Sequence, residues 1–358
     1  MGKLVLTTLA GEFQLHDARP IQRSEQPVFV IGCHRSGTNL LYDMLLSAGG
    51  FAVYRGYLPI HKMLIPRFGS MESPQSRKQI VDTWMHSKGF RRSGLESHDL
   101  ATRLMKDSRN GGDFIRIVMD SVARQQGSPR WAVYDPDNVL YLRKIKAEMP
   151  EALFVHIVRD GRDIALSLKK MGEFRPIPWN RRPASLEATA LYWRWMVQTG
   201  RRNGRLYPDD YLEVRYEELV STPQQTLQTL GRFVGRELDY DQIQSNRLGR
   251  LQESNSSFRD SRGPAESNPI HRWKKLLSAE EVARIEALVG DCLQESGYEL
   301  ANPRRKPALR EAWMRSVYPA LLSAKLWLKS STPAGRFSDL SALEVTEMEH
   351  ETSELTTT

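Results

Sequence analysis

The sequence contains little cysteine: Cys33 and Cys292 are the only two among its 358 residues. Two thiols cannot build a disulfide framework, and no His/Cys spacing typical of a metal centre occurs. The sequence also lacks a run of about 18 apolar residues, which a membrane-spanning helix requires, and its first residues lack the pattern of a signal peptide. We therefore expect a cytoplasmic protein with reduced thiols, no membrane span and no bound metal ion.

Signatures of nucleic-acid binding are absent as well. The formal net charge of +8 suits nucleic acid, an anionic membrane or a polyanionic small molecule. The chain shows no zinc-finger spacing, no aromatic RNA-binding signature and no basic region followed by heptads, so we expect no nucleic-acid partner. A basic surface without a special partner stays an alternative.

A third absence concerns the lysine of nucleotide-hydrolase phosphate loops. Residues 27–41 read as a buried strand, a turn spelled G-x-x-x-x-G-T, and a helix that opens near Thr38. Such a turn directs backbone N–H groups and a helix N-terminus at an anion. Nucleotide hydrolases need Lys and then Ser/Thr after the second glycine, whereas here Arg35 and Ser36 precede Gly37. The loop therefore predicts phosphate binding without metal-assisted γ-phosphoryl chemistry, and a P-loop phosphotransferase is the less favoured interpretation.

Strand-like runs alternate with helical patterns along the rest of the chain. Apolar runs at 131–134, 152–158 and 211–216 are each followed by a helical pattern, which predicts an α/β fold with a P-loop-type parallel sheet flanked by helices. Ligands of such sheets lie beyond the carboxyl ends of the strands. We expect the turns at 32–38, 159–167 and 215–217 to meet there.

The predicted organisation has four parts. They are an N-terminal arm (1–26), one domain (27–300), a basic helical extension (301–331) and an acidic disordered tail (332–358). We expect a flexible loop over the site at 245–272. The basic, aromatic segment 304–329 could dock on its own domain, lie on an anionic membrane or self-associate. Docking is favoured because Pro319 interrupts a continuous amphipathic face.

A second motif also predicts phosphate binding. Residues 155–167 read as a buried strand, a sharp turn and a helix, with Arg159 at the strand end and Ser167 eight residues later. An arginine fork and a hydroxyl can together bind one phosphate.

These two motifs together resemble the sulfotransferase family, which uses 3′-phosphoadenosine 5′-phosphosulfate (PAPS), and the likeness is greatest to its tyrosylprotein and bacterial branch. The resemblance covers about residues 27–300. It implies that the loop binds the 5′-phosphosulfate and the second motif the 3′-phosphate. It extends to Tyr216-Glu-Glu-Leu, to His271-Arg-Trp-Lys-Lys-Leu and to Ser296-Gly-Tyr. The cofactor-binding residues implied are Arg35, Ser36, Gly37, Thr38, Asn39, Arg159, Ser167, Tyr216, Arg272 and Lys274.

The resemblance implies transfer of a sulfuryl group from PAPS to a hydroxyl or amine, leaving adenosine 3′,5′-bisphosphate (PAP). The acceptor could be a small molecule, a sugar, a lipid or a peptide, and no metal is needed. In-line attack would be aided by loop N–H groups and by Arg35 as a catalytic residue.

Two positions depart from the pattern of the family. No glutamate stands about twenty residues after the loop arginine, so the candidate general base is His61, with His98 and Asp99 as weaker alternatives. Tyr134 stands where relatives have a lysine, and Arg55, Lys62 or Lys106 could substitute for it. A degenerate member that binds PAPS or PAP without turnover is therefore the alternative.

Overall fold

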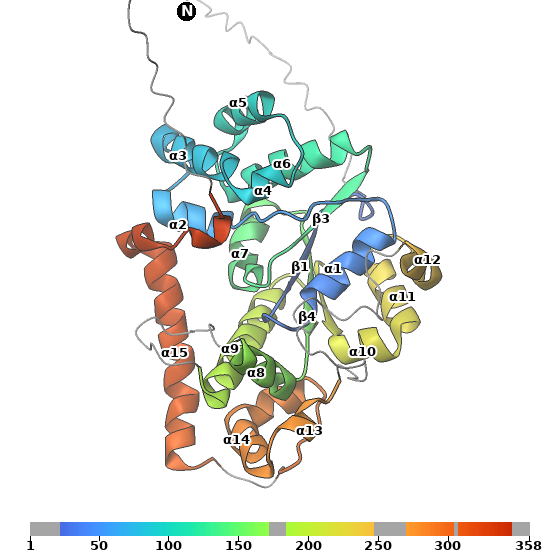
Figure 1. Ribbon diagram of the computed structural model, residues 1–358, viewed down its shortest axis with the longest axis vertical. Helices are drawn as coiled ribbons and strands as arrows, with labels where there is room; N and C mark the ends of the chain where they lie inside the picture. Colours follow the sequence, from blue (N-terminus) through green and yellow to red (C-terminus); the bar gives the residue numbers. More distant parts are fainter. Residues whose placement is uncertain (1–21, 172–183, 247–269, 304–306, 346–358) are drawn as a thin grey trace, which may run out of the picture.

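A computed structural model describes residues 22–171, 184–246, 270–303 and 307–345. Its centre is a five-stranded sheet in the order β2-β3-β1-β4-β5 (Figure 1). The strands are β1 (Val28–Gly32), β2 (Phe51–Ala52), β3 (Arg130–Tyr134), β4 (Leu153–Val158) and β5 (Tyr211–Arg215). Every pair of neighbouring strands is parallel. The predicted α/β fold with a parallel sheet is confirmed.

Helices cover both faces of the sheet (Figure 1). One apolar core lies between the sheet and α1, α10 and α11, and a larger one lies on the side of α6, α7, α9 and α14. The helices that follow strands are α1 (Thr38–Ser47), α7 (Asn138–Glu148), α8 (Gly161–Lys170), α10 (Tyr216–Ser221) and α11 (Pro223–Val234). The helices α9 (Leu186–Gly204), α12 (Tyr240–Ser245), α13 (Trp273–Leu276) and α14 (Ala279–Glu295) come between or after them.

The segment between β2 and β3 is helical throughout most of its length. It forms the π-helical turn η1 (Ile60–Leu64) and the helices α2 (Ile65–Phe68), α3 (Pro74–Met85), α4 (Lys88–Arg91), α5 (Ser97–Asp107) and α6 (Gly111–Gln125). Trp84 and Phe114 pack edge to face in its interior, with ring centroids 5.4 Å apart. This segment lies against the carboxyl end of β3, where one cavity is lined by Tyr54, Gly56, Leu58 and Ile115 together with Val133, Tyr134 and Asp135.

The basic extension is one helix, α15 (Leu309–Ser331), and it continues through Pro319. The expectation that Pro319 interrupts the segment is therefore wrong: the packing of α15 along α9 and α14 holds both halves in line. The Trp195 indole donates to Ser323 (3.0 Å), and Arg315 pairs with Asp291 at 2.5 Å. The favoured prediction of docking is confirmed in that α15 packs on its own domain, whereas membrane binding and self-association stay predictions.

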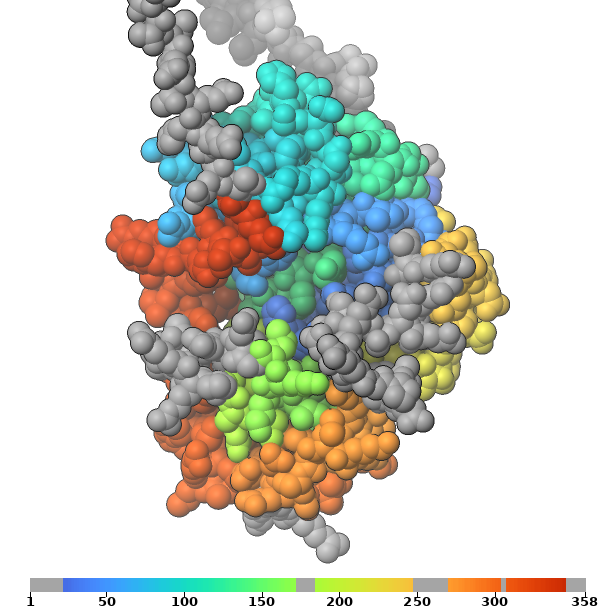
Figure 2. Space-filling model, in the orientation of Figure 1, coloured from blue at the N-terminus to red at the C-terminus, as the bar shows by residue number. Residues whose placement is uncertain are grey.

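Part of the predicted disordered tail is folded. Residues Pro333–Phe337 and Ser341–Leu343 form two short 3₁₀ turns, η3 and η4. They lie against the helical layer of residues 60–107 (Figure 2) because Leu343 is buried in the larger core and Glu344 pairs with Lys88 at 2.6 Å. Residues 1–21 of the predicted arm and 346–358 of the predicted tail lie outside the described residues.

Candidate active site

The turn after β1 has the backbone of an anion-binding loop. Arg35 and Gly37 have positive φ angles of 73° and 100°, and alternation of right- and left-handed residues directs successive N–H groups to one side. The buried Ser36 stabilises the turn, since its hydroxyl donates to the Cys33 carbonyl at 2.7 Å. Helix α1 begins at Thr38, and its N-terminus adds a positive potential at the same place. Asn39, the last predicted loop residue, is exposed on α1.

Arg35 joins the first motif to the second. Its Nε donates to the Ser167 hydroxyl at 3.1 Å, across 132 residues of sequence. Arg159 in turn donates to the Arg35 carbonyl at 3.2 Å. The strand order β1-β4 makes this contact, because the turn after β1 and the turn after β4 lie side by side. Three predicted site residues from two separate motifs therefore lie together.

The Tyr216 ring closes the loop from the direction of β5. The Arg159 guanidinium lies 4.3 Å from the centre of the ring, a cation–π contact. The same ring leaves no room for a side chain at position 37, since a Cβ there would overlap it. Tyr216 is buried, so its ring packs against both the loop and the Arg159 side chain and restricts their movement.

Several cations converge on this place. Burial lowers the pKa of the Arg35 guanidinium, and the nearby charges of Arg159 and Arg272 lower it further. Cations held so close together favour an anion between them. Lys274, the other predicted ligand from that segment, is exposed, with its Nζ 5.6 Å from the Trp273 ring centre.

Asp163 places the segment that carries Arg272. Its carboxylate accepts the backbone N–H groups of His271 at 3.0 Å and Trp273 at 2.9 Å. Burial raises the pKa of Asp163 to about 6, although the charge of Arg159 opposes the rise. The second motif thus fixes a cation that lies more than 100 residues away in the sequence.

A buried polar network supports the site from behind. Asp160 accepts from the Arg162 side chain (2.8 Å) and from the Trp273 indole (3.1 Å). Arg162 also donates to Glu286 at 2.6 Å. The backbone N–H of Asp160 donates to Glu217 (3.0 Å), whose other oxygen accepts from the Tyr298 hydroxyl at 2.7 Å. These contacts therefore join the second motif to the three segments to which the family resemblance extends.

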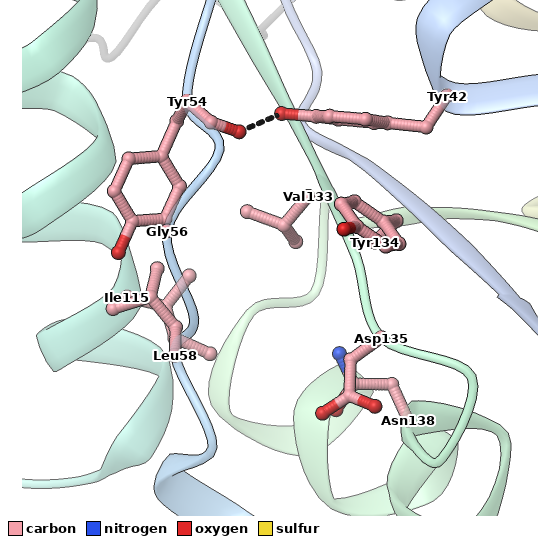
Figure 3. Close-up of a pocket in the computed structure, with 9 residues that line it drawn as sticks. All are labelled: Tyr42, Tyr54, Gly56, Leu58, Ile115, Val133, Tyr134, Asp135 and Asn138. Atoms are coloured by element: carbon pink, nitrogen blue, oxygen red, sulfur yellow. Dashed lines mark hydrogen bonds between the residues drawn. The ribbon is translucent and has the colours of Figure 1, made fainter. Parts of the chain in front are cut away.

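The carboxyl end of β3 borders a small cavity (Figure 3). Its volume is about 10 Å³, room for roughly one water molecule. Tyr134, which stands at the position of the family lysine, packs its ring 4.7 Å from that of Tyr42. Asp135 lines the same cavity, and its Oδ2 is buried without a hydrogen-bond partner.

The structure distinguishes among the three cations that could replace the lysine. Arg55 pairs with Asp43 at 2.7 Å on α1, and Lys106 is exposed near the end of α5. Lys62 reaches the turn after β3 and forms an ion pair with Asp137, while its Nζ donates to the Tyr57 hydroxyl at 3.2 Å. Of the three, Lys62 is the cation whose charge acts on His34 of the phosphate loop.

The sequence analysis missed the pair of His34 and Asp137. His34 Nε2 lies 3.2 Å from Asp137 Oδ2, and the His34 side chain is 35% exposed whereas that of Asp137 is 9% exposed. The sequence did contain a signal for this pair, because His34 belongs to the turn after β1 and Asp137 belongs to the turn after β3. The carboxyl ends of adjacent parallel strands meet at one edge.

His61 lies deeper in the molecule. Its side chain is 1% exposed, and its Nε2 lies 2.7 Å from Glu148 at the far end of α7. The ring also stacks on Tyr141, and a Cβ at Gly111 would come within 2.5 Å of it. The alternatives His98 and Asp99 are exposed on α5. The role of His61 as a base stays a prediction.

The remaining predictions concern the loop over the site, membrane-spanning helices, metal ligands and the cysteines. Most of the predicted loop over the site (247–269) lies outside them. Within the described ranges, no helix is both long and apolar enough to cross a membrane. In the same part of the chain, no three His, Cys, Asp or Glu side chains cluster as metal ligands would. Both cysteines are free thiols, and both are buried.

Replacing Gly37 by alanine is expected to lower the free energy of unfolding by about 1–3 kcal/mol more than replacing Gly49. Both glycines have positive φ, but a Cβ at Gly37 would overlap the Tyr216 ring, whereas nothing lies within 4 Å of one at Gly49. Urea unfolding of the two variants measures the difference. Equal losses would mean that Tyr216 does not press on the loop.

Comparison with known proteins gives a consistent result. A profile described as the sulfotransferase family matches residues 27–240. No curated protein sequence matches the chain significantly.

Solved structures similar to the chain include several sulfotransferases. The sulfotransferase domain from the curacin biosynthetic pathway is 17% identical with a TM-score of 0.49, and the match covers 76% of this chain and 98% of that one. The sulfotransferase domain of the Synechococcus PCC 7002 olefin synthase is 17% identical with a TM-score of 0.45, covering 76% and 95%. A mouse sulfotransferase complexed with PAP is 13% identical with a TM-score of 0.40, covering 76% and 89%.

Proposed function

Because the chain belongs to the sulfotransferase family, we propose that it transfers the sulfuryl group of PAPS to a hydroxyl or amine acceptor. The observation that carries the proposal is the convergence of Arg35, Arg159 and Ser167 from two strand-to-helix turns. Bound PAPS would supply the activated sulfuryl group. The acceptor class is a small molecule, a sugar, a lipid or a peptide.

The two motifs would hold opposite ends of the donor. The N–H groups of the loop, with Ser36, Gly37, Thr38 and Asn39, would bind the 5′-phosphosulfate. Arg159 and Ser167 would bind the 3′-phosphate, with Arg272 and Lys274 closing from the C-terminal side and Tyr216 beside the nucleotide. Arg35 would lie between the two ends of the donor, because its Nε already donates to the Ser167 hydroxyl at 3.1 Å.

Charge develops on the bridging oxygen as the sulfur–oxygen bond breaks. The Arg35 guanidinium and the loop N–H groups would stabilise that charge, since donors fixed before the reaction do not have to reorganise. The buried network behind the loop holds these donors in place. Lys62 would supply the cation that relatives place at the position of Tyr134.

A second candidate function is nucleotide binding without turnover. The observation that favours it is the ring of Tyr134, packed against Tyr42 where the family has a lysine. A P-loop phosphotransferase is the least favoured, because Thr38 stands where that chemistry needs a lysine.

Two measurements test the proposal. Isothermal titration should detect binding of PAP at micromolar concentration, with weaker binding of adenosine 5′-phosphate, which lacks the 3′-phosphate. Transfer of labelled sulfate from PAPS to phenols, sugars and alcohols should then be detectable. Failure of PAP to bind would exclude both the transferase and the nucleotide-binding alternative. Binding of PAP without any transfer would leave only the alternative.

A further inference from the structure

The phosphate loop sends two adjacent side chains in opposite directions. Arg35 contacts Ser167 in the turn after β4, whereas His34 contacts Asp137 in the turn after β3. Strand β1 lies between β3 and β4 in the sheet. The two contacts therefore lie on opposite sides of the loop, with the cations of the nucleotide site on the side of Arg35.

In-line transfer requires the nucleotide and the acceptor to bind on opposite sides of the sulfur. The acceptor must approach the sulfur from the side opposite the bond to the 5′-phosphate. Because Arg35, Arg159 and Ser167 mark the nucleotide side, the acceptor side is that of β3. The His34 ring is a partly exposed imidazole on that side, and it belongs to the loop itself.

We propose that His34 is the general base that takes the proton from the acceptor, and that Asp137 positions its ring. This inference rests on the proposed sulfotransferase function. His34 Nε2 lies 3.2 Å from Asp137 Oδ2, so Nε2–H faces the carboxylate and Nδ1 keeps a lone pair for the proton. A carboxylate that fixes the tautomer and orientation of a basic imidazole is a recurring catalytic arrangement.

The charges around His34 strengthen it as a base. The titratable groups that face this pair are Asp135 at the end of β3, Lys62 of η1, and Lys325 and Lys329 of α15. Cys33, Tyr57, Tyr141 and Tyr192 also face Asp137, and Tyr192 is hydrogen-bonded to it. Burial alone would lower the pKa of His34, but the charge and hydrogen bond of Asp137, together with the charge of Asp135, raise it. His34 and Lys62 together hold the pKa of Asp137 well below its usual range despite burial. Asp137 therefore stays ionised, as a positioning carboxylate must.

The proton and the electrons balance in one step. The acceptor oxygen forms a bond to sulfur while its proton passes to His34 Nδ1. The bond between sulfur and the bridging oxygen breaks, and its electron pair stays on the 5′-phosphate as PAP leaves. The proton on His34 is then released to water, so no further reactant is needed.

Two other groups compete for this role. His61 has a 1% exposed side chain with Nε2 on Glu148, so an acceptor would have to displace packed residues to reach it. The Oδ2 of Asp135 has no hydrogen-bond partner, but it is buried beside a cavity of only about 10 Å³. Variants of both residues belong in the test as comparisons.

The test measures PAP affinity and sulfate release from labelled PAPS, with cyclohexanol, 4-nitrophenol or water alone as acceptor. His34→Gln is expected to slow transfer to cyclohexanol by roughly 10²-fold or more, a typical contribution of a general base. Transfer to 4-nitrophenol, which ionises near neutral pH, should fall much less, and PAP affinity should not change. Added imidazole should restore part of the activity of His34→Ala. The matched control is His86→Gln, a surface histidine at the end of α3, which should leave both readouts unchanged.

The pH profile separates the base from its positioning residue. The rate for wild type should rise with pH through the raised pKa of His34, because only the deprotonated ring accepts a proton. His34→Gln should abolish this rise, and Asp137→Asn should move it to lower pH, since the cause of the raised pKa is removed. A purely structural role of Asp137 would lower the rate without moving the rise.

Each outcome decides between the alternatives. Wild-type rates in His34→Gln, or equal losses with cyclohexanol and 4-nitrophenol, would overturn the inference while the proposed function stands. Loss of the pH-dependent rise in His61→Gln or Asp135→Asn alone would assign the base to that residue. PAP binding by wild type without sulfate release to any acceptor, water included, would overturn both the inference and the transferase activity.

Discussion

Replacing Arg162 by alanine is expected to lower the free energy of unfolding by about 3–5 kcal/mol. Its guanidinium donates to Asp160 at 2.8 Å and Glu286 at 2.6 Å, and all three residues are buried. Burial opposes the charge on Arg162, but hydrogen bonds to the two carboxylates outweigh it and raise its pKa. Without Arg162, two carboxylates would remain in the interior with no cation between them. Urea unfolding of the purified variant measures the loss.

The control is Arg284→Ala. Arg284 also pairs with two carboxylates, Glu187 at 3.2 Å and Glu280 at 3.0 Å, but its side chain is partly exposed. Exposed ion pairs contribute roughly 0–1 kcal/mol. A loss below 1 kcal/mol for both variants would mean that the buried network does not stabilise the fold.

The second large effect concerns Arg159. Arg159→Ala is expected to weaken PAP binding by about 2–4 kcal/mol, or roughly 30- to 1,000-fold in Kd, because a phosphate would lose its charge-assisted partner. The residue is buried, stacks on Tyr216 at 4.3 Å and contacts the loop through the Arg35 carbonyl. Isothermal titration measures the change.

Adenosine 5′-phosphate provides the matched control for Arg159. If Arg159 binds the 3′-phosphate, the variant and wild type should bind this ligand, which lacks that group, with similar affinity. Equal losses for both ligands would mean that the variant has distorted the phosphate loop. Unchanged PAP binding would remove Arg159 from the site. Arg159→Lys should show a smaller loss, since it keeps the charge but not the fork.

Much of the fold follows from local patterns. The continuous apolar run of β4 predicts a strand buried on both faces, and the helical pattern after β3 predicts the helix observed as α7 (Asn138–Glu148). Strand β2 was not predicted, because two residues, Phe51 and Ala52, are too few to display a period. The continuation of α15 through Pro319 was not predicted either, because tertiary packing overrides local propensity there.

Some contacts of the candidate site could likewise be predicted from the sequence, and others could not. Arg35, Arg159 and Ser167 could be predicted because each lies within a contiguous motif whose backbone geometry is known. The contact of His34 with Asp137 spans two motifs and leaves no periodic trace in the sequence, although the turn positions bring the residues to one edge. The residue type of His61 and its neighbours in the chain are visible in the sequence, but the burial of its ring against Gly111 and Glu148 depends on α6 and α7.

The buried network behind the site joins residues that the ribosome synthesises at very different times. A ribosome delivers the phosphate loop and the Arg159 turn early, but the partners of the supporting carboxylates emerge much later. Trp273 donates to Asp160, Glu286 pairs with Arg162, and Tyr298 donates to Glu217. Until those residues have left the exit tunnel, the buried charges have no complement, so the nascent chain cannot close its anion pocket. Binding of the proposed nucleotide would therefore become possible only at the end of translation of the domain, even though the first half of the sequence carries both strand-to-helix motifs.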